Sequence, residues 1–468
     1  MVTSVLPHAK PIRFEHKKEL INPNIVGGLV APPPFMLLGL VHYSTLTLPV
    51  VVQVVLRFAP TVDARNPAAQ VQAPIVQAGR RQQPTADHDG PKPPPRIGQN
   101  RAVNTVRVGF VGVGQIAQHH LRTYRDVPGV QVVAACDTDA AALAKSASEY
   151  NIPFTTGDFR ELIARDDIDA VDVCLHNNLH APVTIAALEA GKHVYCEKPM
   201  AGAYVDAVAM AQAAERTGKK LSIQLSTLYS PHTKLAKRLI EAGHLGKVYH
   251  ARSTGHRRRG RPYVDGYGTS SFVRKATASG GALYDMGVYH IAMMLHLLGN
   301  PSVERITGKT YQETDMDPGR RELGKYDVEE LGLGFVRLGG GLTLDIVEAW
   351  AVHQSSFEAP SVYGSKGGLK LDPLSYFTNL EDVPMNATFE VEGADWRKHV
   401  LDPKQQWFDS PQHHWIGGLL GEIEMIPTAE LALKTMLISE GIYLSERLGR
   451  EVTPEEVAAN SVSTAIAL

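Results

Sequence analysis

The pattern of apolar and polar positions divides the chain near residue 104. From there to residue 226, short apolar runs such as VRVGFV, VQVVAAC, AVDVCL and HVYC alternate with stretches of helical periodicity. Strands that alternate with helices in this way are typical of a parallel sheet with helical crossovers. The pattern therefore predicts a doubly wound α/β (Rossmann) domain over residues 104–226.

A different pattern follows over residues 227–468. Longer alternating strands such as GLTLDIVEAWAV are separated by glycine turns. Alternation of this kind indicates a sheet that is buried on one face and covered there by helices. We expect a second, α+β domain with a mostly antiparallel sheet, which would bind substrate and mediate oligomerisation.

Residues 1–103 show neither pattern. Half of the 30 prolines lie in the first hundred residues, in segments such as APPPF and PKPPP. We expect an N-terminal extension that is mostly disordered. The apolar stretch 35–55 is about long enough to cross a bilayer, but its histidine, threonine, proline and glutamine residues argue against insertion. It also lies too far along the chain for a secretory signal, so we expect no membrane association.

Composition narrows the function classes. The chain has 44% hydrophobic and 21% charged residues and a formal net charge of −2, which is ordinary for a soluble protein. No basic field favours nucleic acid. The three cysteines lie in apolar runs and show no metal-type spacing, which suits buried thiols in a reducing compartment. We therefore expect a cytoplasmic protein without a metal.

A glycine-rich turn follows the first apolar run. In GFVGVGQIA, Gly112 would permit a tight turn, Gly114 would let a pyrophosphate approach the backbone, and Ala117 would allow close helix packing. Free N–H groups at the helix start would meet the phosphates. Asp137 ends the next strand, where a carboxylate can bind the ribose hydroxyls. This context predicts NAD in preference to NADP, although a glycine turn with a helix-capping aspartate is the structural alternative.

The stretch HVYCEKPMA poses a question of its own. An apolar run ends in Glu197-Lys198, and burial of an unpaired charge costs several kcal/mol. Lys198 is therefore expected either to be exposed to solvent or to have a functional role. A strand that simply surfaces and turns at Pro199 is one reading. Ligands of open parallel sheets bind at the carboxyl ends of the strands, and Lys198 is expected at the same rim as Gly112 and Asp137. This placement adds a role at the ligand site to the possible readings of Lys198.

Here the chain resembles the glucose-fructose oxidoreductase / inositol dehydrogenase / MocA family of NAD(P)-dependent oxidoreductases. The resemblance covers roughly residues 104–455 and rests on VGFVGVGQIAQHH, DIDAVDVCLHNNLHAPVTIAALEAGKHVYCEKPMA, SGGALYDMGVYHIAMMLHLLG and GIYLSERLGREV. It implies that Lys198 is a catalytic residue, which lies beside the nicotinamide and hydrogen-bonds the reacting hydroxyl, with a cis bond before Pro199. The implied cofactor contacts are Gly112, Gly114, Gln115, Ile116, Asp137, Asn177, His180, Glu197 and Lys198. His176 stands where the family usually has proline, so that loop is expected to differ, and a histidine at the helix start without a ligand role is the alternative for His180.

The proton-transfer residue is expected in DMGVYH. In a regular helix Asp285 and Tyr289 share a face, and His290 points about 100° aside. The glycine-rich SGGALYDMG also allows the helix to begin later, with Asp285 in the preceding loop. Many family members have histidine at the position of Tyr289, and the tyrosine form resembles the glucose-fructose oxidoreductase and dihydrodiol dehydrogenase branch. Tyr289 is therefore the first candidate, since Lys198 would favour its phenolate, and His290 is the second. Asp285 would orient substrate.

These features predict an NAD-dependent oxidoreductase that acts on a sugar, cyclic polyol or related hydroxyl compound. The family resemblance also admits an NAD-dependent glycosidase that works by transient oxidation, and a sugar-sensing regulator that binds NAD without turnover. A homodimer or homotetramer through the C-terminal sheet is expected. The arginine cluster at residues 257–261 fits either a solvated loop or subunit contact, or contact with a hydroxyl-rich or acidic substrate.

Overall fold

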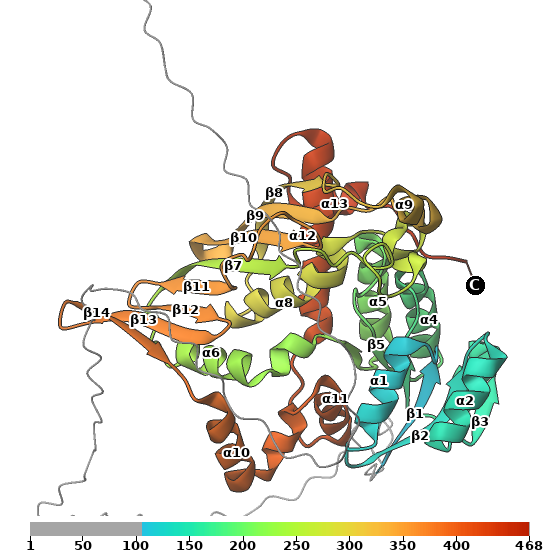
Figure 1. Cartoon of the computed structure of the whole chain (residues 1–468). Helices are drawn as coiled ribbons and strands as arrows, with labels where there is room; N and C mark the ends of the chain where they lie inside the picture. Colours follow the sequence, from blue (N-terminus) through green and yellow to red (C-terminus); the bar gives the residue numbers. More distant parts are fainter. Residues whose placement is uncertain (1–104, 468) are drawn as a thin grey trace, which may run out of the picture. The chain divides into compact units, whose positions relative to one another are not determined.

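A computed structural model describes residues 105–467, so the expectations for residues 1–103 lie outside the described part of the chain. The first sheet has six parallel strands in the order β3-β2-β1-β4-β5-β6 (Figure 1). Their bounds are β1 Val106–Val111, β2 Val130–Cys136, β3 Phe154–Thr156, β4 Ala170–Val173, β5 His193–Cys196 and β6 Leu221–Ile223. The predicted Rossmann fold is confirmed.

Helices connect these strands on both faces of the sheet. Strand order reverses between β1 and β4, which makes their carboxyl ends the expected place for a ligand. The helices are α1 Gln115–Tyr124, α2 Ala140–Tyr150, α3 Phe159–Ile163, α4 Asn177–Glu189 and α5 Tyr204–Thr217. Strands β1 and β4 are almost entirely buried, as expected for continuous apolar runs in a parallel sheet.

The second sheet has eight strands in the order β14-β13-β12-β11-β7-β10-β9-β8. Strands β7 and β10 pair in parallel, and all other neighbours are antiparallel. The predicted mostly antiparallel sheet is therefore confirmed. The strands are β7 Val248–His256, β8 Val303–Tyr311, β9 Leu331–Leu338, β10 Leu342–Ala349, β11 Ser361–Gly364, β12 Gly368–Leu371, β13 Leu374–Leu380 and β14 Val383–Thr388.

Helices α8 and α12 pack against this sheet. The elements outside the sheet are η1 Ser226–Tyr229, α6 Pro231–Glu241, η2 Ser270–Val273, α7 Lys275–Ala278, η3 Leu283–Gly287, α8 Val288–Leu297, α9 Pro318–Gly324, η4 Gly339–Gly341, α10 Val391–Leu401, η5 Pro403–Phe408, α11 Pro411–Leu420, α12 Thr428–Leu448 and α13 Pro454–Asn460. Among residues 105–467, every helix falls short of the length and apolarity that a membrane crossing requires.

The path of the segment from α10 to α11 was not predicted from the sequence. After β14 the chain leaves the second sheet through α10 and η5, and α11 then packs on α1 and β1 of the first sheet. Trp415 of α11 is buried and stacks on Tyr195 of β5, with ring centroids 5.8 Å apart. This segment covers apolar surface that would otherwise face water.

Helix α12 connects the two sheets. It packs against α5 and β6 on the side of the first sheet and against α8 and β8 on the side of the second (Figure 1). At its N-terminus the Thr428 hydroxyl accepts a hydrogen bond from the backbone N–H of Ile223 (3.0 Å) and shares another with Ser222 (2.8 Å). The expected domain boundary between residues 226 and 227 stays a prediction.

Candidate active site

The glycine turn after β1 requires glycine at its first position. Gly112 has φ of +91°, and a Cβ atom there would lie 2.3 Å from the carbonyl oxygen of Cys174. Its N–H donates to the carbonyl of Cys136, 2.8 Å away. The turn is thus pinned between β2 and β4, and no larger residue fits without moving backbone.

The N-terminus of α1 is open to a ligand. Helix α1 begins at Gln115 without a side-chain cap, and Gly114, Gln115 and Ile116 are exposed. A Cβ on Gly114 would meet nothing within 4 Å, so there is space in front of the helix. Ala117 is fully buried, as close packing on the strand requires. Uncapped N–H groups beside open space suit a pyrophosphate.

Asp137 organises the same edge of the sheet. Its Oδ2 accepts the N–H of Val113 at 2.8 Å, and its Oδ1 accepts the N–H of Asp139 at 2.9 Å. The carboxylate is half-buried, and each oxygen keeps a lone pair for a further donor. The arrangement fits the ribose hydroxyls of NAD, and the turn, the open helix start and Asp137 together fit the adenosine ribose and the pyrophosphate.

Three of the polar residues at the start of α4 have different surroundings. His176 caps the helix by position and is exposed, whereas Asn177 donates to the carbonyl of Ala278 at 2.7 Å. His180 is fully buried, with Nδ1 2.7 Å from the carbonyl of Pro199 and Nε2 3.1 Å from that of Leu175. Both ring nitrogens therefore face protein groups. This geometry has His180 support the Pro199 loop, and its contact with cofactor stays a prediction.

Lys198 lies two residues after the end of β5, and the bond to Pro199 is cis. Its Nζ lies 3.0 Å from Oδ1 of Asp285 and 3.1 Å from the carbonyl oxygen of the same residue. It also lies 4.8 Å from the ring centroid of Tyr289, over the ring face. Lys198 is thus held at the junction of the first sheet with the segment that leads into α8.

The charges in this group support one another. Burial opposes the ammonium, but the charges of Asp285 and Glu197 and the neighbouring Tyr289 side chain raise the pKa of Lys198 above its usual value. For Asp285, burial is outweighed by Lys198, Arg257 and a hydrogen bond from Trp350, which together lower its pKa. Trp350 Nε1 donates to Oδ2 at 3.0 Å. Lys198 is therefore a cation and Asp285 an anion at neutral pH.

Tyr289 does not have the lowered pKa that the sequence suggested. Burial raises its pKa, and the opposing effect of Lys198 is too small to reverse the shift. Asp285 lies in η3, a π-helical turn that precedes α8. Because a π turn bonds residues five apart, the four-residue face rule of an α-helix does not hold across Asp285.

His290 has a partner that the sequence analysis missed. Its Nδ1 lies 2.9 Å from Oε2 of Glu348, a fully buried residue of β10 that also accepts a hydrogen bond from Ser253 at 3.0 Å. Burial opposes protonation of His290, but the Glu348 carboxylate outweighs it and raises the pKa of the imidazole. The sequence signal for Glu348 was only an acidic residue inside an alternating strand.

Tyr289 and His290 line the same cavity of about 720 Å³. Its walls come from η1, α6, the end of β7, the start of α8 and the segment 357–360. The lining includes Thr227, His232, Thr254, His256, Arg257, Met286, Met293, Phe357, Glu358 and Asp372. A few polar groups among apolar ones in a space of this size are typical of a small-molecule site.

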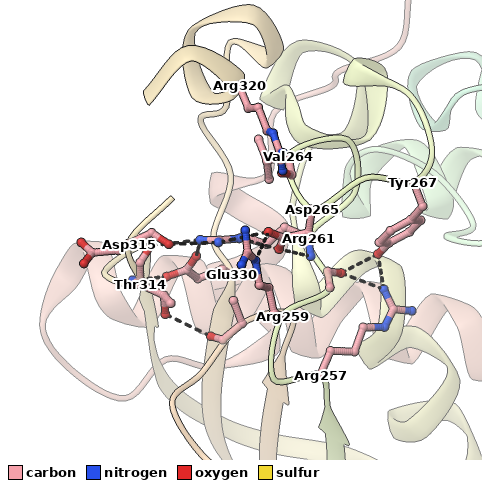
Figure 2. Close-up of polar contacts among 12 residues, drawn as sticks. Arg257, Arg259, Arg261, Val264, Asp265, Tyr267, Thr314, Asp315, Arg320 and Glu330 are labelled. Atoms are coloured by element: carbon pink, nitrogen blue, oxygen red, sulfur yellow. Dashed lines mark hydrogen bonds and ion pairs between the residues drawn. The ribbon is translucent and has the colours of Figure 1, made fainter. Parts of the chain in front are cut away.

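The arginine cluster separates into different environments (Figure 2). Arg257 lines the cavity and lies 3.5 Å from Asp285 Oδ2. Arg261 is buried, where it pairs with Asp265 at 2.9 Å and Glu330 at 2.9 Å. Arg259 is largely exposed and reaches Asp265 at 3.1 Å. One arginine thus faces the candidate site, while Arg261 holds the loop together.

The fold and site define an oxidoreductase with an NAD-binding Rossmann fold. The profile described as "Oxidoreductase family, NAD-binding Rossmann fold" matches residues 106–225, and that of the "GFO/IDH/MocA C-terminal domain" matches residues 233–370. The chain belongs to the GFO/IDH/MocA family. The resemblance predicted from the sequence is confirmed.

Several characterised proteins are similar over most of their length. D-glucoside 3-dehydrogenase of Escherichia coli is 27% identical over 355 residues, which are 74% of this chain and 97% of that protein. The crystal structure of aldose-aldose oxidoreductase from Caulobacter crescentus, complexed with glycerol, is 26% identical with a TM-score of 0.61, over 75% of this chain and 99% of that one. Levoglucosan dehydrogenase in complex with NADH has a TM-score of 0.65 at 21% identity, over 75% of this chain and 99% of that one, and shows the shared fold.

Proposed function

We propose that the protein uses NAD to oxidise a CH–OH group of a sugar, a cyclic polyol or a related hydroxyl compound. The observation that carries the proposal is the Lys198–Asp285 pair, 3.0 Å apart, between the nucleotide edge of the first sheet and the cavity beside the second. A largely buried lysine kept charged by a carboxylate is suited to stabilise a developing alkoxide. The alternative, in which the strand ends at the protein surface and Lys198 is only solvated, does not explain why Lys198 pairs with Asp285.

Each residue has a proposed role. Bound NAD would supply the hydride acceptor. Lys198 would donate a hydrogen bond to the reacting hydroxyl and stabilise its oxygen as negative charge develops. Asp285, itself held by Lys198 and Trp350, would orient the substrate through its remaining lone pairs. Gly112, Gly114, Gln115, Ile116 and Asp137 would hold the cofactor, and Asn177, His180 and Glu197 would shape the loops around it.

For proton transfer we favour His290 over Tyr289. With Nδ1 turned to Glu348, Nε2 is the nitrogen left to accept the hydroxyl proton. A phenol whose pKa is raised stays neutral near pH 7 and is a weak base there, whereas an imidazole titrates close to it. Tyr289, beside Lys198, would instead hydrogen-bond the substrate.

The cavity and the relatives support the proposed substrate class. Threonine, histidine and arginine side chains line the cavity and offer hydrogen bonds to several hydroxyls. Similar proteins are named D-glucoside 3-dehydrogenase, D-apiose dehydrogenase and levoglucosan dehydrogenase.

We further propose a cytoplasmic homodimer or homotetramer that associates through the second sheet, where Tyr249, Phe335 and Phe377 are exposed on strands.

The test is a spectrophotometric screen of sugars, glycosides, inositols and uronates with NAD and with NADP, comparing wild type with Lys198→Ala. We expect NADH formation with at least one class and a loss of about a hundredfold or more in kcat for the variant. The variant should retain NADH binding by fluorescence titration. Near-normal turnover in Lys198→Ala would refute the catalytic role. Release of reducing sugar from a glycoside without NADH accumulation would instead indicate the glycosidase, and NAD binding with no turnover of any compound the regulator.

A further inference from the structure

A row of ionisable side chains lies buried directly behind Lys198. The imidazole of His120, on α1, bridges two carboxylates: its Nδ1 lies 3.0 Å from Oδ2 of Asp172 on β4, and its Nε2 lies 2.9 Å from Oε1 of Glu197. The exposed fractions are 0% for His120, 0% for Asp172 and 4% for Glu197. None of the three lines the cavity beside Tyr289 and His290.

Burial of this kind requires pairing, since an isolated buried carboxylate costs several kcal/mol. Burial disfavours the charged imidazole, but Asp172 raises the pKa of His120 well above its usual value. Burial likewise opposes the Glu197 carboxylate, yet the hydrogen bond and charge of His120 lower its pKa. His120 is therefore an imidazolium that keeps Glu197 ionised.

The remaining groups around His120 do not provide a competing charge. Cys174 Sγ lies 3.5 Å from Nδ1 and 3.3 Å from Asp172, and burial raises the pKa of its thiol, so it stays neutral. The ring of Tyr195 lies 5.7 Å from the His120 ring, centroid to centroid, and burial raises the pKa of that phenol. Asp172 and Glu197 are thus the two charged partners of the imidazolium.

Glu197 connects His120 to Lys198. Its second oxygen, Oε2, accepts the backbone N–H of Lys198 at 3.0 Å. The same carboxylate is therefore fixed by His120 on one side and fixes the Lys198 backbone on the other. Its charge also helps to raise the pKa of Lys198.

We infer that His120 is a positioning residue of the active site, which acts through Glu197 to fix the backbone of Lys198 and thus the approach of its Nζ to Asp285. The inference rests on the proposed function of Lys198 and adds a second layer of residues to it. His120 need not contact substrate or cofactor, because its effect passes through one carboxylate. Outer residues that orient an inner group in this way are common where geometry must be exact to a fraction of an ångström.

The informative variant is His120→Gln. Without the imidazolium, burial drives Glu197 to protonate, and neutral Glu197 no longer supports the Lys198 ammonium, so the pKa of Lys198 should fall. The groups that face Lys198 are Glu197, Asp285 and Tyr289, with Arg257 beyond Asp285; only Glu197 changes. NMR of the full chain labelled at lysine Cε, with the Lys198 resonance assigned by its loss in Lys198→Met, follows this titration without any substrate.

We expect the Lys198 titration midpoint to fall by at least one pH unit in His120→Gln, and kcat to fall about ten- to a hundredfold while the NADH dissociation constant changes less than threefold. Glu197→Gln, a neutral isostere that leaves His120 in place, should lower the Lys198 midpoint similarly and covers the case in which His120→Gln does not fold. Cys174→Ala is the matched control, because it removes the thiol that touches Asp172 and the His120 ring but leaves His120 and both carboxylates in place; it should shift the midpoint and lower kcat by less than His120→Gln.

An unchanged Lys198 midpoint in a folded His120→Gln or Glu197→Gln protein overturns the inference, and so does an equal shift in Cys174→Ala. Failure of the proposed function would look different. In that case wild type would show no dehydrogenase turnover in the substrate screen, while the NMR titration would still report on the coupling between His120 and Lys198.

Discussion

Nδ1 of His290 lies 2.9 Å from Oε2 of Glu348, and this contact determines which nitrogen of the imidazole remains for chemistry. Glu348 is fully buried and held by Ser253, so it is a fixed acceptor rather than a mobile surface group. The neutral ring then carries its proton on Nδ1, and Nε2 is the basic atom. A carboxylate behind a histidine is a recurrent way to orient a general base.

Glu348→Gln tests this pair. Glu348 raises the pKa of His290, so its removal should lower that pKa and move the acid limb of the kcat profile to lower pH. We also expect kcat at neutral pH to fall about tenfold, because the ring is less firmly oriented. Ser253→Ala, which touches Glu348 but not the ring, should produce a smaller change. An acid limb that does not move would remove Glu348 from the mechanism.

Tyr289→Phe and His290→Asn should lower kcat to different extents. His290→Asn is expected to lower kcat by a hundredfold or more and to abolish the acid limb. Tyr289→Phe should raise KM for substrate and lower kcat by less, because only a hydrogen bond is lost. Both should bind NADH normally. If Tyr289→Phe is the inactive variant and the profile of His290→Asn keeps its acid limb, tyrosine is the proton acceptor after all.

Asp137→Ala should weaken the selection of NAD over NADP. Wild type should prefer NAD, because a carboxylate at the ribose repels the additional phosphate of NADP. The variant should lose NAD affinity by about tenfold, corresponding to about 1.4 kcal/mol, with little change for NADP. Fluorescence titration with both reduced cofactors measures this. A tenfold wild-type preference for NADP would contradict the assignment of Asp137.

The parts of the fold that were predictable are those with a strong local signal. Continuous apolar runs identified the long strands of the first sheet, whereas β3, with three residues, is too short to show a period. The glycine turn and Lys198 were recognisable because each needs a particular residue type. Glu348 was not recognisable, since a charged residue in an alternating strand normally faces water. His290 reaches it only because α8 packs against β7, the parallel neighbour of β10.

Helical periodicity could have predicted that the His120 side chain is buried. It lies one position before Leu121 and three after Ala117, on the buried face of α1. Its partners come from β4 and from the end of β5, dozens of residues away, and only the sheet order brings them together. The π turn at Leu283–Gly287 was not predictable either, because a local change from α- to π-helical hydrogen bonding leaves no mark in the pattern of apolar positions.

Stability should fall in mild acid because His414 is buried in its neutral form. Its Nδ1 donates to the carbonyl of Trp407 and its Nε2 accepts the N–H of Ile426 at 2.8 Å, so a second proton has no acceptor. Burial lowers the pKa of His414 to about 4. Between pH 6.5 and about 4 the unfolded chain therefore binds the extra proton, and the free energy of unfolding decreases by up to about 1.4 kcal/mol per pH unit.

Urea denaturation at several pH values measures that slope. His414→Gln should be less stable than wild type at pH 7, because a buried hydrogen-bonded ring is lost, but its stability should depend less on pH below 6.5. His193 and His296, whose pKa values burial also lowers to about 4, contribute in the same direction and remain in the variant. A slope identical to that of wild type would show that His414 titrates normally.

The helix α12 restricts how the enzyme can move. Its 21 residues are packed against elements of both sheets, and Thr428 at its start is hydrogen-bonded to β6. A hinge that separated the two sheets would have to strip apolar contacts from this helix and break those hydrogen bonds, so wide opening and closing of the two halves is disfavoured. Substrate entry should accordingly be gated by the loops at the cavity mouth, and turnover should respond more to changes in the 257–267 loop than to changes near residue 226.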